Sequence, residues 1–165
     1  MKIIKNILFP TQFTRYSIDI LEYAILFARS LHARLHLLHV ITRDEAPNFE
    51  ALNEFFLAIS ENTENIVTRT ALNQVDLIKV HLKDVDIWRG VVRYAHEAEI
   101  DLVMMAARSP ETSEDKSLSH TALSVLEHAP CPVMVIRLPE ERRHHQSRFE
   151  LSLQEMKREL ASRQK

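Results

Sequence analysis

Apolar residues along this chain form short continuous runs that alternate with longer stripes at helical spacing. The runs have the length and composition of buried strands, and they occupy residues 3–9, 35–41, 75–82, 101–106 and 133–138. The stripes between them predict helices that begin near Ser17, Asn48, Asp86 and Leu118. A strict alternation of strand and helix predicts a parallel sheet covered by helices on both faces.

Each helical stripe consists of apolar residues three or four positions apart. In chain order the stripes are Ile18, Leu21, Ile25, Ala28 and Leu31; Leu52, Phe55, Ile59 and Ile66; Ile87, Val91, Tyr94, Ala95 and Ala98; and Leu118, Ala122, Val125, Leu126 and Ala129. Polar residues at the helix starts predict N-caps, at Thr14 or Ser17, at Asp86, and at Ser117 or Ser119.

Gly90 is the single glycine of the chain, and it falls inside the helix predicted after Asp86. A glycine inside a helix costs about 1 kcal/mol relative to alanine. That position indicates close packing against a neighbour rather than a ligand-binding loop.

A narrower apolar stripe follows the last strand. Its members, Phe149, Leu153, Met156 and Leu160, are spaced by four, three and four residues. Such a seam predicts an amphipathic helix that lies on another surface, either of its own domain or of a partner subunit. The chain therefore divides into a single α/β domain at residues 1–138 and a C-terminal helical extension at residues 139–165.

Composition narrows the classes of function. The chain has 165 residues, which suits one domain, and its net charge of −2 favours neither a nucleic acid nor an anionic membrane as partner. No apolar run is long enough to span a bilayer, and no cleavage site follows the first strand, so we expect a cytoplasmic protein without a signal peptide. The single cysteine, Cys131, excludes an internal disulfide.

Motifs for catalysis or metal binding are missing. One glycine excludes both a Walker A loop and a GxGxxG fingerprint, and no GxSxG elbow accompanies the serines of residues 109–119. His36 and His39 lie three apart on one predicted strand, so their side chains point to opposite faces. We therefore expect neither an enzyme nor a metal site.

Two segments resemble the universal stress proteins. KNILFPTQFTRYSIDILEYAILFARSLHARLHLLHV is similar to the opening of that family, and HAPCPVMVIR is similar to its last helix end and last strand. The resemblance covers residues 3–138. It implies a five-stranded parallel sheet in the order 3-2-1-4-5 and a dimer, and many members of the family bind ATP.

ATP-binding members carry a motif of three spaced glycines followed by a Ser or Thr. The glycine positions correspond here to Ala106, Ser109 and Ser119, and the hydroxyl position corresponds to His120. Members of the family also have an Asp just after the first strand that recognises adenine, and the corresponding residue here is Gln12. The resemblance thus implies a degenerate nucleotide pocket, and no cofactor is expected. With the fold rule that ligands bind outside the carboxyl ends of the strands, the candidate positions are Thr11, Gln12, Ala106, Ala107, Arg108, Ser109, Ser119 and His120.

Three functions are compatible with these features. The first is a non-catalytic, dimeric stress protein that has lost ATP binding and acts through an unknown regulatory protein partner. The alternative is a switch whose altered pocket still holds ATP or AMP. The third is an enzyme on a related α/β fold, and the sequence argues against it because the motifs of such enzymes are missing after the first strand. The expected dimer interface is the last strand, which is apolar on both faces: Val133, Met134, Val135 and Ile136.

Overall fold

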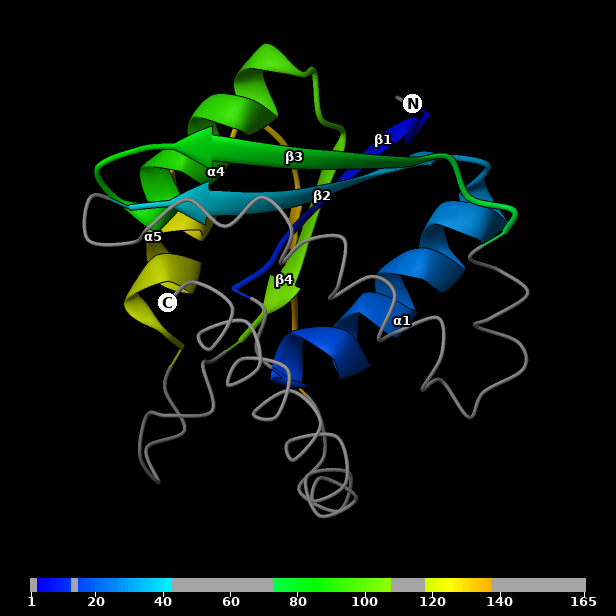
Figure 1. Ribbon diagram of the computed structural model, residues 1–165, viewed down its shortest axis with the longest axis horizontal. Coiled ribbons are helices and arrows are strands. Elements are labelled where there is room, and N and C mark those ends of the chain that lie inside the picture. Colours follow the sequence, from blue (N-terminus) through cyan, green and yellow to red (C-terminus); the bar gives the residue numbers. More distant parts are fainter. Residues whose placement is uncertain (1–2, 13–14, 43–72, 108–117, 138–165) are drawn as a thin grey trace, which may run out of the picture.

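The computed structural model describes residues 3–12, 15–42, 73–107 and 118–137 (Figure 1). The elements in this part of the chain are β1 (Asn6–Pro10), α1 (Arg15–Leu31), β2 (Arg34–Ile41), β3 (Leu77–Lys83), α4 (Ile87–Glu97), β4 (Leu102–Ala106), α5 (His120–His128) and β5 (Val133–Ile136). Each of these strands and helices was predicted, with ends that shift by a few residues. The helix predicted from residue 48 to 72 and the C-terminal helix lie outside the described residues.

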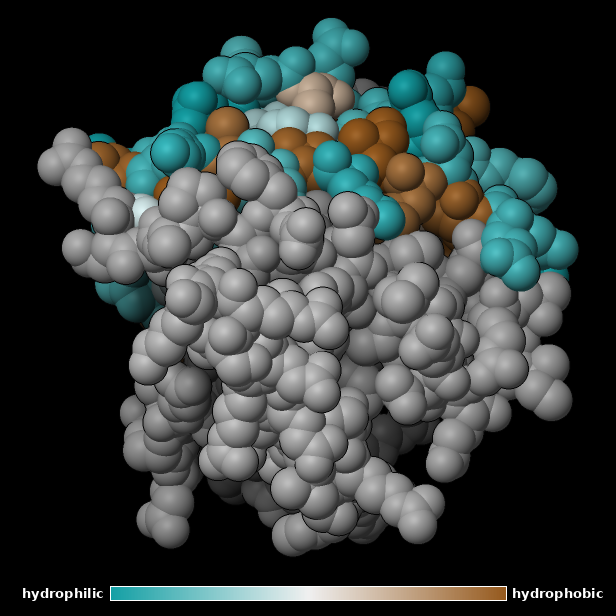
Figure 2. All heavy atoms as spheres, viewed as in Figure 1, coloured by the Kyte–Doolittle hydropathy of each residue, from teal (hydrophilic) through white to brown (hydrophobic). Residues whose placement is uncertain are grey.

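The strands form one parallel sheet in the order β3-β2-β1-β4-β5, which confirms the order implied by the family resemblance. In the centre, Leu8 of β1 lies between His36 of β2 and Val103 of β4. The edges of the sheet are β3 and β5. Figure 2 shows apolar residues mixed with polar ones over the region where β3 lies.

Helices cover both faces of the sheet, as the alternating pattern predicts. On one face α1 buries Leu21, Ala24 and Ile25 against β1 and β2, in a cluster that includes Ile7 and Phe9. On the other face α4 and α5 bury Val91, Ala95, Ala122 and Val125 against Leu8 and its neighbours. Successive residues of β1 thus belong to opposite clusters, which is why this strand reads as a continuous apolar run.

Gly90 is packed against β2, as its position in a helix indicates. A Cβ atom built on Gly90 would lie 2.7 Å from Cγ1 and 2.9 Å from Cγ2 of Val40. Real Cβ atoms essentially never approach other atoms so closely. The glycine therefore sets the distance between α4 and the sheet.

The predicted N-cap at Ser119 is confirmed, whereas the alternative at Ser17 is wrong because Ser17 lies inside α1. Ser119 caps α5, and its hydroxyl oxygen accepts a hydrogen bond from the Ala122 N–H at 3.1 Å. Asp86 occupies the N-cap position of α4, but its side chain makes no capping bond and pairs with Arg89 at 3.2 Å instead. After α1 and α4 the chain turns through His32 and Glu99, which have φ values of 53° and 50°, the left-handed region where glycine is the usual choice.

Two members of the predicted stripes are not part of the core. Leu31 is 41% exposed and Leu126 is 42% exposed. Leu31 is the last residue of α1. Leu126 follows Val125 directly, and because successive helical residues point about 100° apart, only Val125 of this pair faces the sheet. Within the described residues, no helix is both long and apolar enough to cross a membrane.

Candidate functional site at the carboxyl ends of the strands

The candidate residues that follow β1 and β4 lie together at the carboxyl end of the sheet. Thr11 and Gln12 follow β1, and Ala106 ends β4 directly before Ala107. Because β1 and β4 are paired neighbours with parallel direction, these residues are brought together as the fold rule requires. Arg108 and Ser109 lie outside the described residues.

Thr11 is locked into the structure by its main chain. It is 2% exposed, its N–H donates to the Leu38 carbonyl at 2.8 Å, and its carbonyl accepts from Nδ1 of His39 at 3.0 Å. Since a carbonyl can only accept, Nδ1 of His39 carries the proton in this contact. Gln12 is exposed, so it is the residue after β1 whose side chain faces outward.

Ser119 joins the residue after β4 to the start of α5, and we call this junction of Ala107, Ser119 and Ala122 the closed corner. Its N–H donates to the Ala107 carbonyl at 3.0 Å, while its hydroxyl caps the helix at Ala122. Ala107 in turn donates to the Ile136 carbonyl at 2.9 Å. The N–H and the hydroxyl oxygen of Ser119 are thus both bonded within the chain, and His120 stands exposed as the first helical residue.

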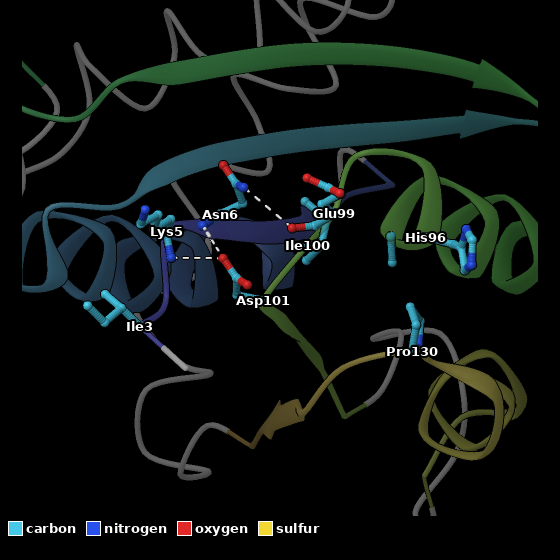
Figure 3. Close-up of a pocket in the computed structure, with 9 residues that line it drawn as sticks. Ile3, Lys5, Asn6, His96, Glu99, Ile100, Asp101 and Pro130 are labelled. Carbon is cyan, nitrogen blue, oxygen red and sulfur yellow. Dashed lines mark hydrogen bonds between the residues drawn. The ribbon is translucent and has the colours of Figure 1, made fainter. Parts of the chain in front are cut away.

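A hollow of about 610 Å³ lies at the opposite, amino end of the sheet (Figure 3). Its lining comes from the start of β1 and the residues before it, the end of α4, the turn into β4 and the turn after α5. It consists of Ile3, Lys5, Asn6, Ala95, His96, Glu99, Ile100, Asp101 and Pro130. None of the candidate positions at the carboxyl ends contributes to it. Pattern reasoning did not single out this hollow, because its residues are far apart in sequence.

Asp101 has a structural task in that hollow. Its Oδ2 accepts from the N–H of Lys5 at 2.9 Å and from the N–H of Asn6 at 3.0 Å, as the dashed lines of Figure 3 show. Its own N–H donates to the Asn6 carbonyl at 2.9 Å. These bonds join the amino ends of β1 and β4, so the carboxylate holds two strands in register rather than presenting a reactive group.

A pair formed by buried His36 and half-buried Tyr94, which sequence reasoning missed, connects β2 to α4. Nδ1 of His36 lies 2.8 Å from the Tyr94 hydroxyl, and Nε2 of His36 is buried without a hydrogen-bond partner. Burial lowers the pKa of His36, the nearby Arg34 lowers that pKa further, and Asp76 opposes the shift. Burial also raises the pKa of Tyr94. No local signal marks this pair, since its members are separated by 58 residues.

The histidines do not converge on a metal site in this part of the chain. His36 bonds to α4, whereas His39 bonds to Thr11 on the opposite face of the sheet. Across the described ranges, no group of three or more His, Cys, Asp or Glu side chains comes together.

Comparison with known proteins places the chain in a family. The model of the universal stress protein family matches residues 4–137. The chain belongs to the universal stress protein family. No curated protein matches its sequence closely enough to be recognised.

Solved structures of universal stress proteins share this fold at low sequence identity. One, in complex with cAMP, is 15% identical with a TM-score of 0.63, and the match covers 84% of this chain and 100% of that one. UspA from Lactobacillus plantarum is 20% identical with a TM-score of 0.58, covering 83% and 100%. The protein from Archaeoglobus fulgidus in complex with dAMP is 15% identical with a TM-score of 0.59, covering 82% and 100%. At these identities the likeness concerns the fold.

Proposed function

We propose that this universal stress protein is a non-catalytic dimer that acts through protein contacts without using ATP. The observation that supports the proposal is the closed corner at Ser119, the N-cap of α5, whose N–H donates to the Ala107 carbonyl and whose hydroxyl accepts from the Ala122 N–H. A phosphate at a helix N-terminus needs free N–H groups and close backbone approach. To bind the Ser119 N–H, a phosphate of ATP would first have to break its bond to the Ala107 carbonyl, which joins the residue after β4 to the N-cap of α5.

Side-chain chemistry at the same corner supports the proposal. Gln12 lacks the charge with which an Asp would accept hydrogen bonds from adenine or ribose, and His120 replaces a phosphate-facing hydroxyl. Each lost contact of this kind costs about 1–3 kcal/mol. Two or three such losses move a micromolar site to the millimolar range.

Calorimetric titration with Mg-ATP and with AMP tests this proposal. We expect dissociation constants near millimolar for both ligands. The matched variant restores the family motif through Gln12→Asp, Ala106→Gly, Ser109→Gly, Ser119→Gly and His120→Ser, and should bind ATP at least about tenfold more tightly if the contacts act as argued. A micromolar or lower dissociation constant for the unaltered chain, or nucleotide that co-purifies with it, contradicts the proposal.

The second candidate function is a nucleotide-binding switch. It is favoured by the structures of family members in complex with cAMP and with dAMP, and by a sheet that keeps the ends of β1 and β4 side by side. In this case the same titration gives tight binding of AMP, and the closed corner at Ser119 is one of two states. Titration of the unaltered chain therefore separates the two candidates.

Dimerisation through β5 is supported by the contrast between the two edges of the sheet. The edge strand β3 carries exposed Lys79 and Lys83, charges that discourage pairing with another chain. The other edge strand, β5, has the sequence VMVI without a charge. Its half-buried side chains complete the two core clusters, with Met134 and Ile136 on one face and Val133 and Val135 on the other.

β5 therefore offers a partner the unpaired N–H and C=O groups of its main chain rather than an exposed apolar surface. Antiparallel pairing of two copies across a two-fold axis uses the same edge twice. Light scattering at micromolar concentration should give the mass of two chains. A monomer under those conditions contradicts this part of the proposal without affecting the titration result.

A further inference from the structure

α5 carries more apolar surface than its contact with the sheet explains. Ala122 and Val125 are buried against the sheet, but Leu123 and Leu126 are 52% and 42% exposed. Residues three apart on a helix lie on the same side, one turn from each other. These two leucines therefore form a short apolar ridge on the outer side of α5.

The ridge begins close to the place where the chain leaves the sheet. Ala107 bonds to both elements, since its carbonyl accepts from Ser119 at the start of α5 and its N–H donates to the carbonyl of Ile136 at the end of β5. The start of α5 and the end of β5 are thus joined through one residue. The polypeptide that continues past Ile136 starts beside the end of α5 that carries Leu123.

The chain beyond β5 is long enough to return to this ridge. Residues 137–148 separate β5 from the apolar stripe of Phe149, Leu153, Met156 and Leu160. Extended, this tether spans up to about 40 Å at roughly 3.3 Å per residue, whereas the nine residues of α5 extend over only about 13 Å at 1.5 Å per residue. A short tether also gives an effective concentration on the order of millimolar, which favours a segment of the same chain over a separate molecule.

We propose that the stripe of residues 149–160 docks on the Leu123 and Leu126 ridge of its own chain. The stripe is apolar on one side only, and an isolated amphipathic helix of this length is marginal in water, so it needs an apolar surface to lie on. The ridge is such a surface, and it faces away from the sheet. The docked segment leaves the main-chain edge of β5 available to a second subunit.

Disulfide trapping in the full-length chain tests this inference. In a Cys131→Ala background, Leu126→Cys is combined with Met156→Cys in the stripe, and in the matched control with Arg158→Cys, which lies on the opposite side of the predicted helix. With oxidised glutathione as the oxidant, the Met156→Cys pair should form an intramolecular disulfide at least about tenfold faster than the control. In guanidinium chloride the two rates should become equal.

Two results would overturn the inference. Equal rates for the two pairs in native buffer would show that the stripe has no preference for the ridge. A disulfide-linked dimer on a denaturing gel, in place of the intramolecular product, would show that the ridge is covered by the tail of another subunit. Neither result depends on whether the protein binds ATP.

Discussion

Gly90 shows how one residue sets the spacing between a helix and a sheet. The space that a side chain would occupy is already filled by both γ-methyl groups of Val40, at 2.7 and 2.9 Å from the position of a Cβ atom. Gly90 is not required here for a left-handed backbone conformation, because its φ is not positive. The sequence indicated close packing at Gly90, whereas the neighbour it packs against emerges only when α4 crosses β2.

Gly90→Ala should destabilise the protein, although alanine is the better helix former. The helical gain of about 1 kcal/mol is outweighed by overpacking that costs about 1–3 kcal/mol. In a Val40→Ala background both γ-methyl groups are gone and the nearest remaining atom is Cβ of Asp84 at 3.3 Å, so the same Gly90→Ala change should be less destabilising. Urea unfolding of the four proteins in this double-mutant cycle measures the effect, and additive free energies would contradict it.

His36 makes folding sensitive to pH through burial. The pKa of His36 in the folded protein is lowered from its ordinary 6.5, first by burial and then by Arg34, with Asp76 acting in the opposite sense. Well above pH 6.5 neither state carries the proton, and the contribution of His36 to stability is complete. As the pH falls below 6.5, the unfolded chain binds a proton that the folded chain does not, so stability decreases until the pH passes the lowered pKa.

His36→Gln should flatten the acid limb of the stability curve. Between pH 6.5 and the lowered pKa, the wild-type free energy of unfolding should fall more steeply than that of the variant, by up to about 1.4 kcal/mol per pH unit for one proton. Chemical unfolding at a series of pH values from 7.5 downward measures both slopes. The contributions of the other histidines cancel in the comparison, and parallel curves would rule out His36 as the cause.

At the scale of single elements, α5 shows which structural features a sequence pattern predicts and which it does not. The hydroxyl cap at Ser119 and the burial of Ala122 and Val125 follow from the order of residues along the helix. The exposure of Leu126 does not, because apolar spacing alone cannot tell a side chain that faces the sheet from one beside it. The bond from Ser119 N–H to the Ala107 carbonyl is likewise a product of the loop path.

Replacing Ser119 with Ala should weaken the start of α5. Loss of the bond between its hydroxyl and the Ala122 N–H should lower the free energy of unfolding by about 1 kcal/mol. Ser119→Asp is the matched control, since a carboxylate accepts the same bond and suits the positive end of the helix dipole. Thermal and urea unfolding compare the two variants; equal losses for both would mean that the hydroxyl does not act as a cap.

For the molecule as a whole, strand content and layering were predictable because periodicity records burial. The order β3-β2-β1-β4-β5 came from the family resemblance instead, since alternating patterns permit several strand orders. Contacts such as His36 with Tyr94 and His39 with Thr11 were not predictable, because they join residues from separate elements. Arg108, Ser109 and the C-terminal stripe stay predictions, as they lie outside the described residues.

Val135→Pro should dissociate the proposed dimer and leave the fold intact. Val103 N–H donates to the Pro132 carbonyl and Ala107 N–H donates to the Ile136 carbonyl, so even-numbered residues of β5 bond to β4 and Val135 turns its N–H to the open edge. Proline at Val135 thus removes an outward donor. Light scattering should report a monomer with unchanged circular dichroism.

Met134→Pro serves as the control, because the N–H of Met134 points toward β4. This substitution should lower the melting temperature as well as weaken assembly. If Val135→Pro remains a dimer of full mass, the subunits meet through another surface.

The unequal edges of the sheet also bear on how far assembly can proceed. Two chains joined through β5 would form a continuous sheet bounded on both outer sides by β3, and each boundary would display Lys79 and Lys83. Strand-to-strand addition would then have no uncharged edge left to extend. A protein with one uncharged edge strand and one edge strand that carries lysines stops assembling at two copies, whereas two uncharged edge strands would allow open-ended fibres.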